Sequence, residues 1–451
     1  MAVTDKLPFH LRGNYAPIGD EITATELEVT GEIPPELDGR YLRNGANPIT
    51  GESEHWFFGD GMIHGVRLSD GRAEWYRNRY VRTPFVDPLA SADGETPTPD
   101  SANSKANTHV VAHAGRILCL EEGHVPYEID GELDTVGPHT FGGRLDSSFT
   151  AHPKICPRTG EMIGFGYGFG PPYLTYHRVS ADGELVQSSE IDLPAPVMMH
   201  DFNVTDRRVV FMDLPVVFSM DRAMAGTMPF AFEPDNGARL GVMPRDGDNN
   251  SVQWIDVEPC YVFHPVNSYD HPSDPDRVIV DVARYPSMWA ASPEFDEVAA
   301  LWRWDIDLTT GSVAETQLDD RPIEFGRVPD GRVAQDYRYG YAVSSGDDAG
   351  LVSGGGSAIV KYDLEAGTSS AHEFGGGRQP GEMVFVPADG VDADDRGAED
   401  HGYLLGYVYD RAADRSDLVI LDAADVAAEP LATVHLPRRV PFGFHGSWVP
   451  A

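Results

Sequence analysis

The sequence is poor in basic residues, with 34 Lys and Arg against 72 Asp and Glu and a formal net charge of −38. Nucleic-acid binding depends on clustered Lys and Arg that neutralise phosphates, so this composition excludes a nucleic-acid partner. It also argues against broad attraction to anionic lipid headgroups. We expect a solvated acidic surface that keeps the protein soluble.

Cysteine is scarce, and long apolar runs are absent. The 451 residues contain three cysteines, Cys119, Cys156 and Cys260, which are far apart and odd in number. This excludes a disulfide framework and a zinc site of paired cysteines, and predicts three small buried side chains. No apolar run reaches transmembrane length, and the N-terminus lacks the apolar core of a signal peptide. We therefore expect a protein of the reducing cytoplasm.

Helical periodicity is also rare, and short strands separated by glycine-containing turns dominate the chain. Residues 62–68 and 72–82, for example, flank a turn at Asp70-Gly71, which is typical of a β-hairpin. One helical stretch is expected at residues 293–298.

The domain organisation follows from the same pattern. Such a chain favours an all-β sandwich, barrel or propeller, although no WD40 or kelch repeat occurs at a fixed period. Because no linker interrupts the pattern, we expect a single domain over residues 1–451.

Four of the sixteen histidines share a local setting, beside Pro, Gly or Asp in an otherwise apolar segment. They are His152, His200, His264 and His445. His445 lies in the terminal segment 444–450, and a chain end frays unless something ties it down. No two of the four are close enough in sequence for a local chelate. A shared metal would require a fold that brings four strand ends to one point, as a ring of blades does.

Several motifs follow one another in an order and spacing that are specific only together. They are Ile33–Pro48 (IPPELDGRYLRNGANP), Gly59–Met62, Asn107–Val110, Phe149–Lys154, Glu324–Phe325, Arg338–Tyr341 and Phe444–Trp448 (FHGSW). Over most of its length the chain thus resembles the carotenoid cleavage oxygenases, a family that also contains lignostilbene dioxygenases and the animal retinoid isomerase.

This resemblance implies an all-β, seven-bladed β-propeller with long loops that form a cap over an axial metal site. The metal would be Fe(2+), bound by four histidines that match His152, His200, His264 and His445. Imidazole suits iron, and iron oxygenases keep open positions for dioxygen. No catalytic residue beyond the iron site is implied.

The resemblance also implies three glutamates that accept hydrogen bonds from ligand imidazoles. Glu122, Glu324 and Glu382 match these positions and would support His200, His264 and His445 respectively, while no such carboxylate is implied for His152. These carboxylates orient the rings and make the ligand nitrogens more basic. Glu121 is the alternative to Glu122. Thr108 matches a threonine that points toward the vacant coordination position, and it could instead be an ordinary strand residue.

The implied activity is cleavage of a conjugated C=C bond of a carotenoid or apocarotenoid with O₂, which gives aldehyde or ketone products. The alternative substrate is a hydroxystilbene such as a lignostilbene or resveratrol. Stilbene cleavers of the family place a lysine directly before the first of the three glutamates, to deprotonate the substrate phenol. Glu121 occupies that position here and cannot stabilise a phenolate. The sequence is also compatible with isomerisation without cleavage and with a non-catalytic propeller that binds a partner.

Residues 215–232 are rich in Met and Phe. In the family, apolar insertions near this point line the substrate tunnel and contact membranes. We therefore expect either an apolar tunnel mouth that makes peripheral membrane contact or a long loop packed on the propeller. No obligate protein partner is indicated.

Overall fold

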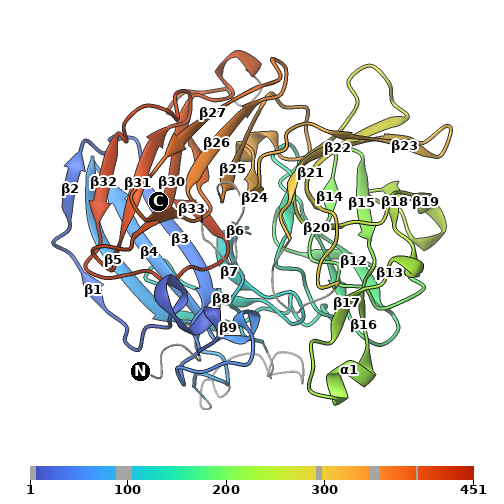
Figure 1. Ribbon diagram of the computed structural model, residues 1–451, viewed down its shortest axis with the longest axis horizontal. Coiled ribbons are helices and arrows are strands. Elements are labelled where there is room, and N and C mark those ends of the chain that lie inside the picture. Colours follow the sequence, from blue (N-terminus) through green and yellow to red (C-terminus); the bar gives the residue numbers. More distant parts are fainter. Residues whose placement is uncertain (1–6, 88–103, 291–296, 346–355, 393–394) are drawn as a thin grey trace. The chain divides into compact units, whose positions relative to one another are not determined.

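The computed structural model consists almost entirely of β-strands (Figure 1). The structure describes residues 7–87, 104–290, 297–345, 356–392 and 395–451. Among these residues the only α-helix is α1 (Met220–Met224). Short 3₁₀ turns occur at Phe9–Leu11, Gly13–Tyr15, Trp56–Phe58, Pro234–Asn236, Asn249–Ser251, Asp330–Arg332 and Arg396–Ala398. The helix expected at 293–298 falls mainly outside the described residues.

Contacts within the chain divide it into two compact units, and unit 1 comprises residues 1–151, 357–359 and 370–451. Its described strands form three antiparallel sheets. Their strands, in sheet order, are β1 (Thr23–Ala24), β5 (Arg72–Tyr80), β4 (Gly61–Ser69), β3 (Gly39–Ala46) and β33 (Gly446–Pro450); β6 (His109–His113), β7 (Arg116–Leu120), β8 (Tyr127–Ile129) and β9 (Thr135–Pro138); and β2 (Glu28–Gly31), β32 (Ala432–His435), β31 (Arg415–Asp422), β30 (Gly402–Asp410) and β28 (Arg378–Pro380), with β29 (Val384–Pro387) also paired to β30.

The last strand of the chain is held by one of the first. β33 pairs with β3, so that Trp448 lies opposite Tyr41 in the sheet, and the end of the chain lies beside β3 in Figure 1. The approach is close: a Cβ on Gly39 would stand 2.5 Å from the Trp448 ring, so glycine is required there. Pairing and packing together tie down the terminal segment that carries His445.

Unit 2 comprises residues 152–356 and 360–369. Three of its sheets, in sheet order, are β10 (Lys154–Ile155), β11 (Met162–Tyr167), β12 (Leu174–Val179) and β13 (Leu185–Ile191); β14 (Asn203–Val204), β15 (Arg208–Asp213), β18 (Arg239–Pro244) and β19 (Gln253–Asp256); and β20 (Tyr261–Asp270), β21 (Arg277–Tyr285), β22 (Ala300–Asp307) and β23 (Ser312–Gln317). β16 (Val216–Phe218) and β17 (Phe230–Phe232) form a separate pair. A further sheet, whose first two strands lie in unit 2, has the order β24 (Ile323–Arg327), β25 (Tyr339–Ser344), β26 (Ala358–Asp363) and β27 (Thr368–Glu373).

The described residues thus contain seven sheets of four or more strands, which are the blades of a seven-bladed β-propeller. The predicted fold class is confirmed, and so is the predicted hairpin of β4 and β5, in which Asp70 and Gly71 take the positive φ angles of a tight turn. Between neighbouring blades the packing is apolar. In unit 2, Phe165, Phe202 and Phe211 are fully buried in one such cluster.

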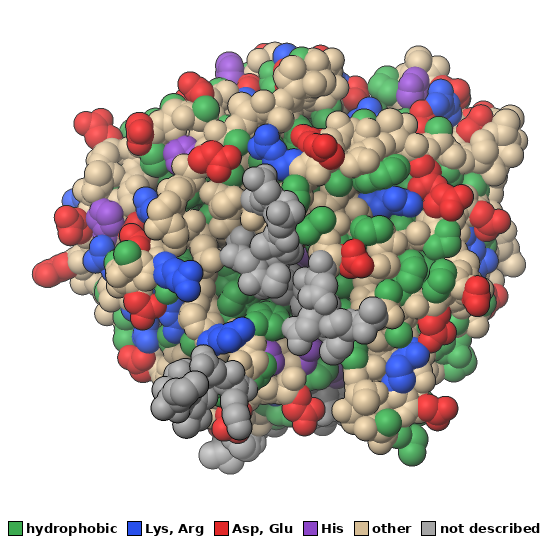
Figure 2. Space-filling view, viewed as in Figure 1, with side chains coloured by type: hydrophobic (Ala, Val, Ile, Leu, Met, Phe, Trp, Pro, Cys, Tyr) green, Lys and Arg blue, Asp and Glu red, His purple; other side chains and the backbone are tan. Residues whose placement is uncertain are grey.

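Two expectations from composition are also confirmed. Cys119, Cys156 and Cys260 are buried and unbridged, and burial raises the pKa of the Cys260 thiol to about 11. Figure 2 shows Asp and Glu side chains dispersed over the visible face. In the described part of the chain, no helix has the length and apolar character needed to cross a membrane.

Candidate metal centre

The three predicted histidine ligands of unit 2 occupy equivalent places in three successive sheets, near the start of the first strand. His152 precedes β10, His200 precedes β14, and His264 lies within β20. The register of β20 shifts between Val262 and Pro265, around His264. Such an irregularity bends a strand and redirects a side chain away from the regular alternation. All three imidazoles therefore project from the beginnings of strands.

The three imidazoles converge. Nε2 of His200 lies 3.0 Å from Nε2 of His264, and the ring centre of His152 lies 4.4 Å from that of His200 and 5.1 Å from that of His264. One nitrogen from each ring lies within 4.8 Å of the others. The side chains are buried, with exposed fractions of 4%, 6% and 9% for His152, His200 and His264. Three imidazoles this close can share one metal ion.

A buried carboxylate orients one of these rings. Oε2 of Glu324 lies 2.5 Å from Nδ1 of His264 and accepts a hydrogen bond of 2.8 Å from the Phe325 amide. Since a carboxylate only accepts, we assign the proton of His264 to Nδ1, and Nε2 keeps its lone pair. Burial, and then the nearby Glu324 charge, raise the pKa of Tyr285 well above its ordinary value. The phenol at this site therefore stays neutral.

Unit 1 contains the same arrangement at its last strand. His445 immediately precedes β33, and its Nδ1 lies 3.0 Å from Oε1 of Glu382. The other oxygen of Glu382 accepts a hydrogen bond of 2.8 Å from the Gly446 amide. Both side chains are 4% exposed. By the same reasoning the Nε2 lone pair of His445 is available to a metal.

The remaining predicted residues of unit 1 flank the first two strands of another sheet, since Thr108 immediately precedes β6 and Glu122 follows β7. Thr108 is buried, and its hydroxyl donates to Oδ1 of Asn107 at 2.9 Å. Its backbone carbonyl accepts the backbone amide of His445 at 3.1 Å. Glu122 is half-buried. Glu121 accepts the Lys105 amide at 2.5 Å and contacts Nδ1 of His124 at 3.0 Å. Because Glu121 is already engaged by Lys105 and His124, Glu122 is favoured over Glu121 as the glutamate that would support His200. The roles of Thr108 and Glu122 stay predictions.

One neighbour of the histidine cluster was missed in the sequence. Oδ2 of Asp201 lies 3.8 Å from Nδ1 of His152, the histidine that had no predicted carboxylate. The available signal was an acidic residue directly after His200, inside the apolar segment 197–202.

The donor set is chemically uniform. The clustered rings offer imidazole nitrogen and no thiolate, a set that suits iron as well as other late first-row metals. Carboxylates on the far ring nitrogens supply negative charge without occupying coordination positions. The residues present therefore fit a divalent iron ion with open positions for other ligands.

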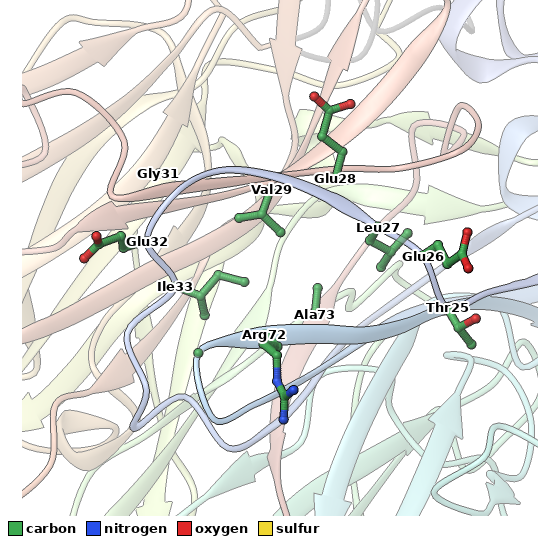
Figure 3. A pocket seen from close by; sticks show the side chains of 11 residues that line it. Thr25, Glu26, Leu27, Glu28, Val29, Gly31, Glu32, Ile33, Arg72 and Ala73 are labelled. Carbon is green, nitrogen blue, oxygen red and sulfur yellow. The ribbon is translucent and has the colours of Figure 1, made fainter.

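Two other features contain none of the four histidines. The pocket in Figure 3 is lined by residues 25–29, 31–33 and 71–73 of unit 1, and none of the predicted site residues lines it. Segment 215–232 of unit 2 forms the β16–β17 pair and α1. Phe218 of β16 stacks on Phe169 with ring centres 4.1 Å apart, while Met220 and Met224 are 58% and 81% exposed.

Known proteins resemble this chain over nearly its whole length. Residues 15–450 match the model of the family described as retinal pigment epithelial membrane protein. A carotenoid cleavage oxygenase of Mycobacterium tuberculosis is 40% identical, with 98% of this chain and 97% of the relative covered.

Solved structures of related proteins also resemble this chain. The lignostilbene dioxygenase of Pseudomonas brassicacearum has a TM-score of 0.86 at 29% identity, over 98% of this chain and 99% of that one. A cobalt-substituted apocarotenoid oxygenase of Synechocystis has a TM-score of 0.85 at 28% identity, over 98% of both chains.

Proposed function

Because the chain belongs to the family of the retinal pigment epithelial membrane protein and the carotenoid cleavage oxygenases, we propose that it is an Fe(II)-dependent dioxygenase. It would cleave one conjugated C=C bond of a carotenoid or apocarotenoid with O₂, to give two carbonyl products. The observation that carries the proposal is the convergence of buried imidazoles, with Glu324 on the far nitrogen of His264.

The proposed ligands are His152, His200, His264 and His445, each a candidate for metal binding. His445 is included because its Nδ1 contacts Glu382 as that of His264 contacts Glu324. When bound, the iron would supply activation of dioxygen beside an electron-rich alkene. The cobalt substitution of the related apocarotenoid oxygenase supports a metal site in this family.

The protein's own residues would hold the metal and orient the imidazoles that bind it. Glu324 and Glu382 keep a proton on each Nδ1 and thereby a lone pair on each Nε2, and Glu122 would do the same for His200. Their negative charge offsets the 2+ charge that four neutral imidazoles leave on the ion. Thr108 would border the open coordination position. No side-chain nucleophile takes part.

The first substrate choice is a polyene, because the relatives include carotenoid cleavage enzymes. The similarity to a lignostilbene dioxygenase keeps a hydroxystilbene as the second candidate. Glu121 disfavours it, because an acidic side chain engaged with His124 cannot stabilise a substrate phenolate.

The deciding experiment is product identification by mass after aerobic incubation of the iron-loaded enzyme with an apocarotenal and, separately, a 4-hydroxystilbene. Two carbonyl fragments from the apocarotenal are expected. Turnover of the stilbene alone would reject the polyene assignment, and an isomer of unchanged mass would indicate isomerisation. A protein that binds no iron after anaerobic reconstitution would be a binding propeller instead of an enzyme.

Segment 215–232 is the proposed mouth of the substrate tunnel and a peripheral membrane contact of a cytoplasmic enzyme. The exposed Met220 and Met224 support this, since an apolar substrate partitions into lipid. Co-sedimentation with phosphatidylcholine vesicles should fall in the variant M220S/M224S. Equal sedimentation of the variant and the unchanged protein would reject the contact.

A further inference from the structure

The carboxylate of Asp201 is buried and held on both oxygens. Nζ of Lys154 lies 2.8 Å from Oδ1 and 2.9 Å from Oδ2, and Oδ1 also accepts the Phe202 amide at 2.6 Å. The residue is 2% exposed, whereas the Lys154 side chain is 23% exposed. The ammonium group therefore reaches inward to a buried anion.

The same carboxylate lies beside a candidate metal ligand. Oδ2 is 3.8 Å from Nδ1 of His152, whose side chain is 4% exposed. That separation is too long for a direct hydrogen bond, so the interaction is an electrostatic one between the carboxylate charge and the polar Nδ1 side of the ring. Charges interact strongly when water is excluded, and a buried carboxylate is costly unless its surroundings compensate it.

We propose that Asp201 is the positioning residue of His152, and that Lys154 limits the negative charge that reaches the ring. The proposal rests on the metal site proposed above. A negative charge beside Nδ1 favours the proton on that nitrogen, which leaves the Nε2 lone pair for the metal. It also attracts a cation on the opposite side of the ring. His152 then has a carboxylate neighbour as His264 and His445 do, supplied by the residue that follows another ligand, His200.

Two variants of the same ion pair separate this role from a structural one. D201N and K154M both remove the pair between Asp201 and Lys154, so a purely structural pair predicts similar losses of melting temperature in the metal-free protein and unchanged metal affinity. The proposed role predicts opposite effects on affinity. D201N should raise the Kd for Co(II) about tenfold, which is the lower end of the effect expected for a lost outer carboxylate. K154M should lower the Kd, because the Phe202 amide still holds the carboxylate while Lys154 no longer offsets its negative charge.

The measurement is a titration of the metal-free, full-length chain with Co(II) by visible absorption, with a melting curve for each variant. The Co(II) band should shift in D201N, because the field at one ligand changes. Equal Kd and an unchanged band in D201N would overturn the proposal, and so would a Kd that rises equally in both variants. If D201N does not fold, the double variant D201N/K154M leaves no buried charge unpaired and should still raise the Kd.

Co(II) binding by the unchanged protein distinguishes failure of the metal site from failure of the role of Asp201. If it binds no Co(II), the metal site and the role of Asp201 both fail. If it binds one equivalent and D201N binds identically, the role of Asp201 fails alone.

Discussion

Replacing Glu324 with Gln tests the candidate metal centre through a residue that is not itself a ligand. The carboxylate is 3% exposed and accepts hydrogen bonds from Nδ1 of His264 and the Phe325 amide. Glutamine keeps the size of the side chain but removes the charge. A hydrogen bond to a charged group contributes about 1.5–3 kcal/mol, and about 1.4 kcal/mol corresponds to a factor of ten in an equilibrium constant. The variant should therefore bind metal about 10- to 100-fold more weakly.

The assay is competition for Co(II), or for Fe(II) without oxygen, against a chromogenic chelator. The matched control is Glu315→Gln, because Oε2 of Glu315 also accepts a hydrogen bond from a ring nitrogen, Nε1 of Trp304 at 3.0 Å. Glu315 and Trp304 lie on β23 and β22, whereas His264 lies on β20. The control should lose stability and keep the metal affinity of the unchanged protein. A folded Glu324→Gln variant whose affinity stays within about twofold of the unchanged protein would refute the reasoning.

Three further outcomes are expected. Deleting residues 444–451 should abolish metal binding measured by elemental analysis, because it removes His445 together with the strand paired to β3; retained stoichiometric metal would exclude His445. Phe211→Ala should lower the free energy of unfolding in urea by about 3–5 kcal/mol, because Phe211 is fully buried between two blades; a loss below about 1 kcal/mol would contradict the packing. Burial, and then His10, lower the pKa of His55 to about 4 from 6.5, so the unfolded chain binds more protons there and stability should fall by at most about 3 kcal/mol as pH drops from 6.5 to 4. His55→Asn should flatten this part of a melting-temperature profile against pH, and an unchanged slope would assign it to other groups.

Local signals predicted the hairpins well. The Asp70-Gly71 turn has an inherent preference for positive φ, so β4 and β5 could be predicted without knowledge of their neighbours. Helix α1 was missed because its five residues are too few for helical periodicity to show. Ser219 caps the start of this helix, because its side chain accepts the Arg222 amide, and this capping contact is visible only in the structure.

The candidate ligands could be chosen from the order of motifs, but their contacts could not. Asp201 follows His200 in the chain and contacts Lys154 and His152, which lie near the start of a different sheet. Nothing in the local sequence of either segment encodes that meeting, because it depends on how one blade packs against the next through apolar residues such as Phe165 and Phe202. The same holds for Glu324 and His264, which belong to separate sheets.

The sequence by itself determined the all-β character, the acidic surface, the choice of the four candidate histidine ligands and the family, because each depends only on residue types and their order. Only the tertiary structure decided which nitrogen of His264 and of His445 contacts a carboxylate, and that Asp201 lies beside His152. The reason is physical. Turn preference and hydrophobic alternation act over a few residues, whereas an imidazole's proton and orientation are set by charges that strand pairing and blade packing bring from distant parts of the chain.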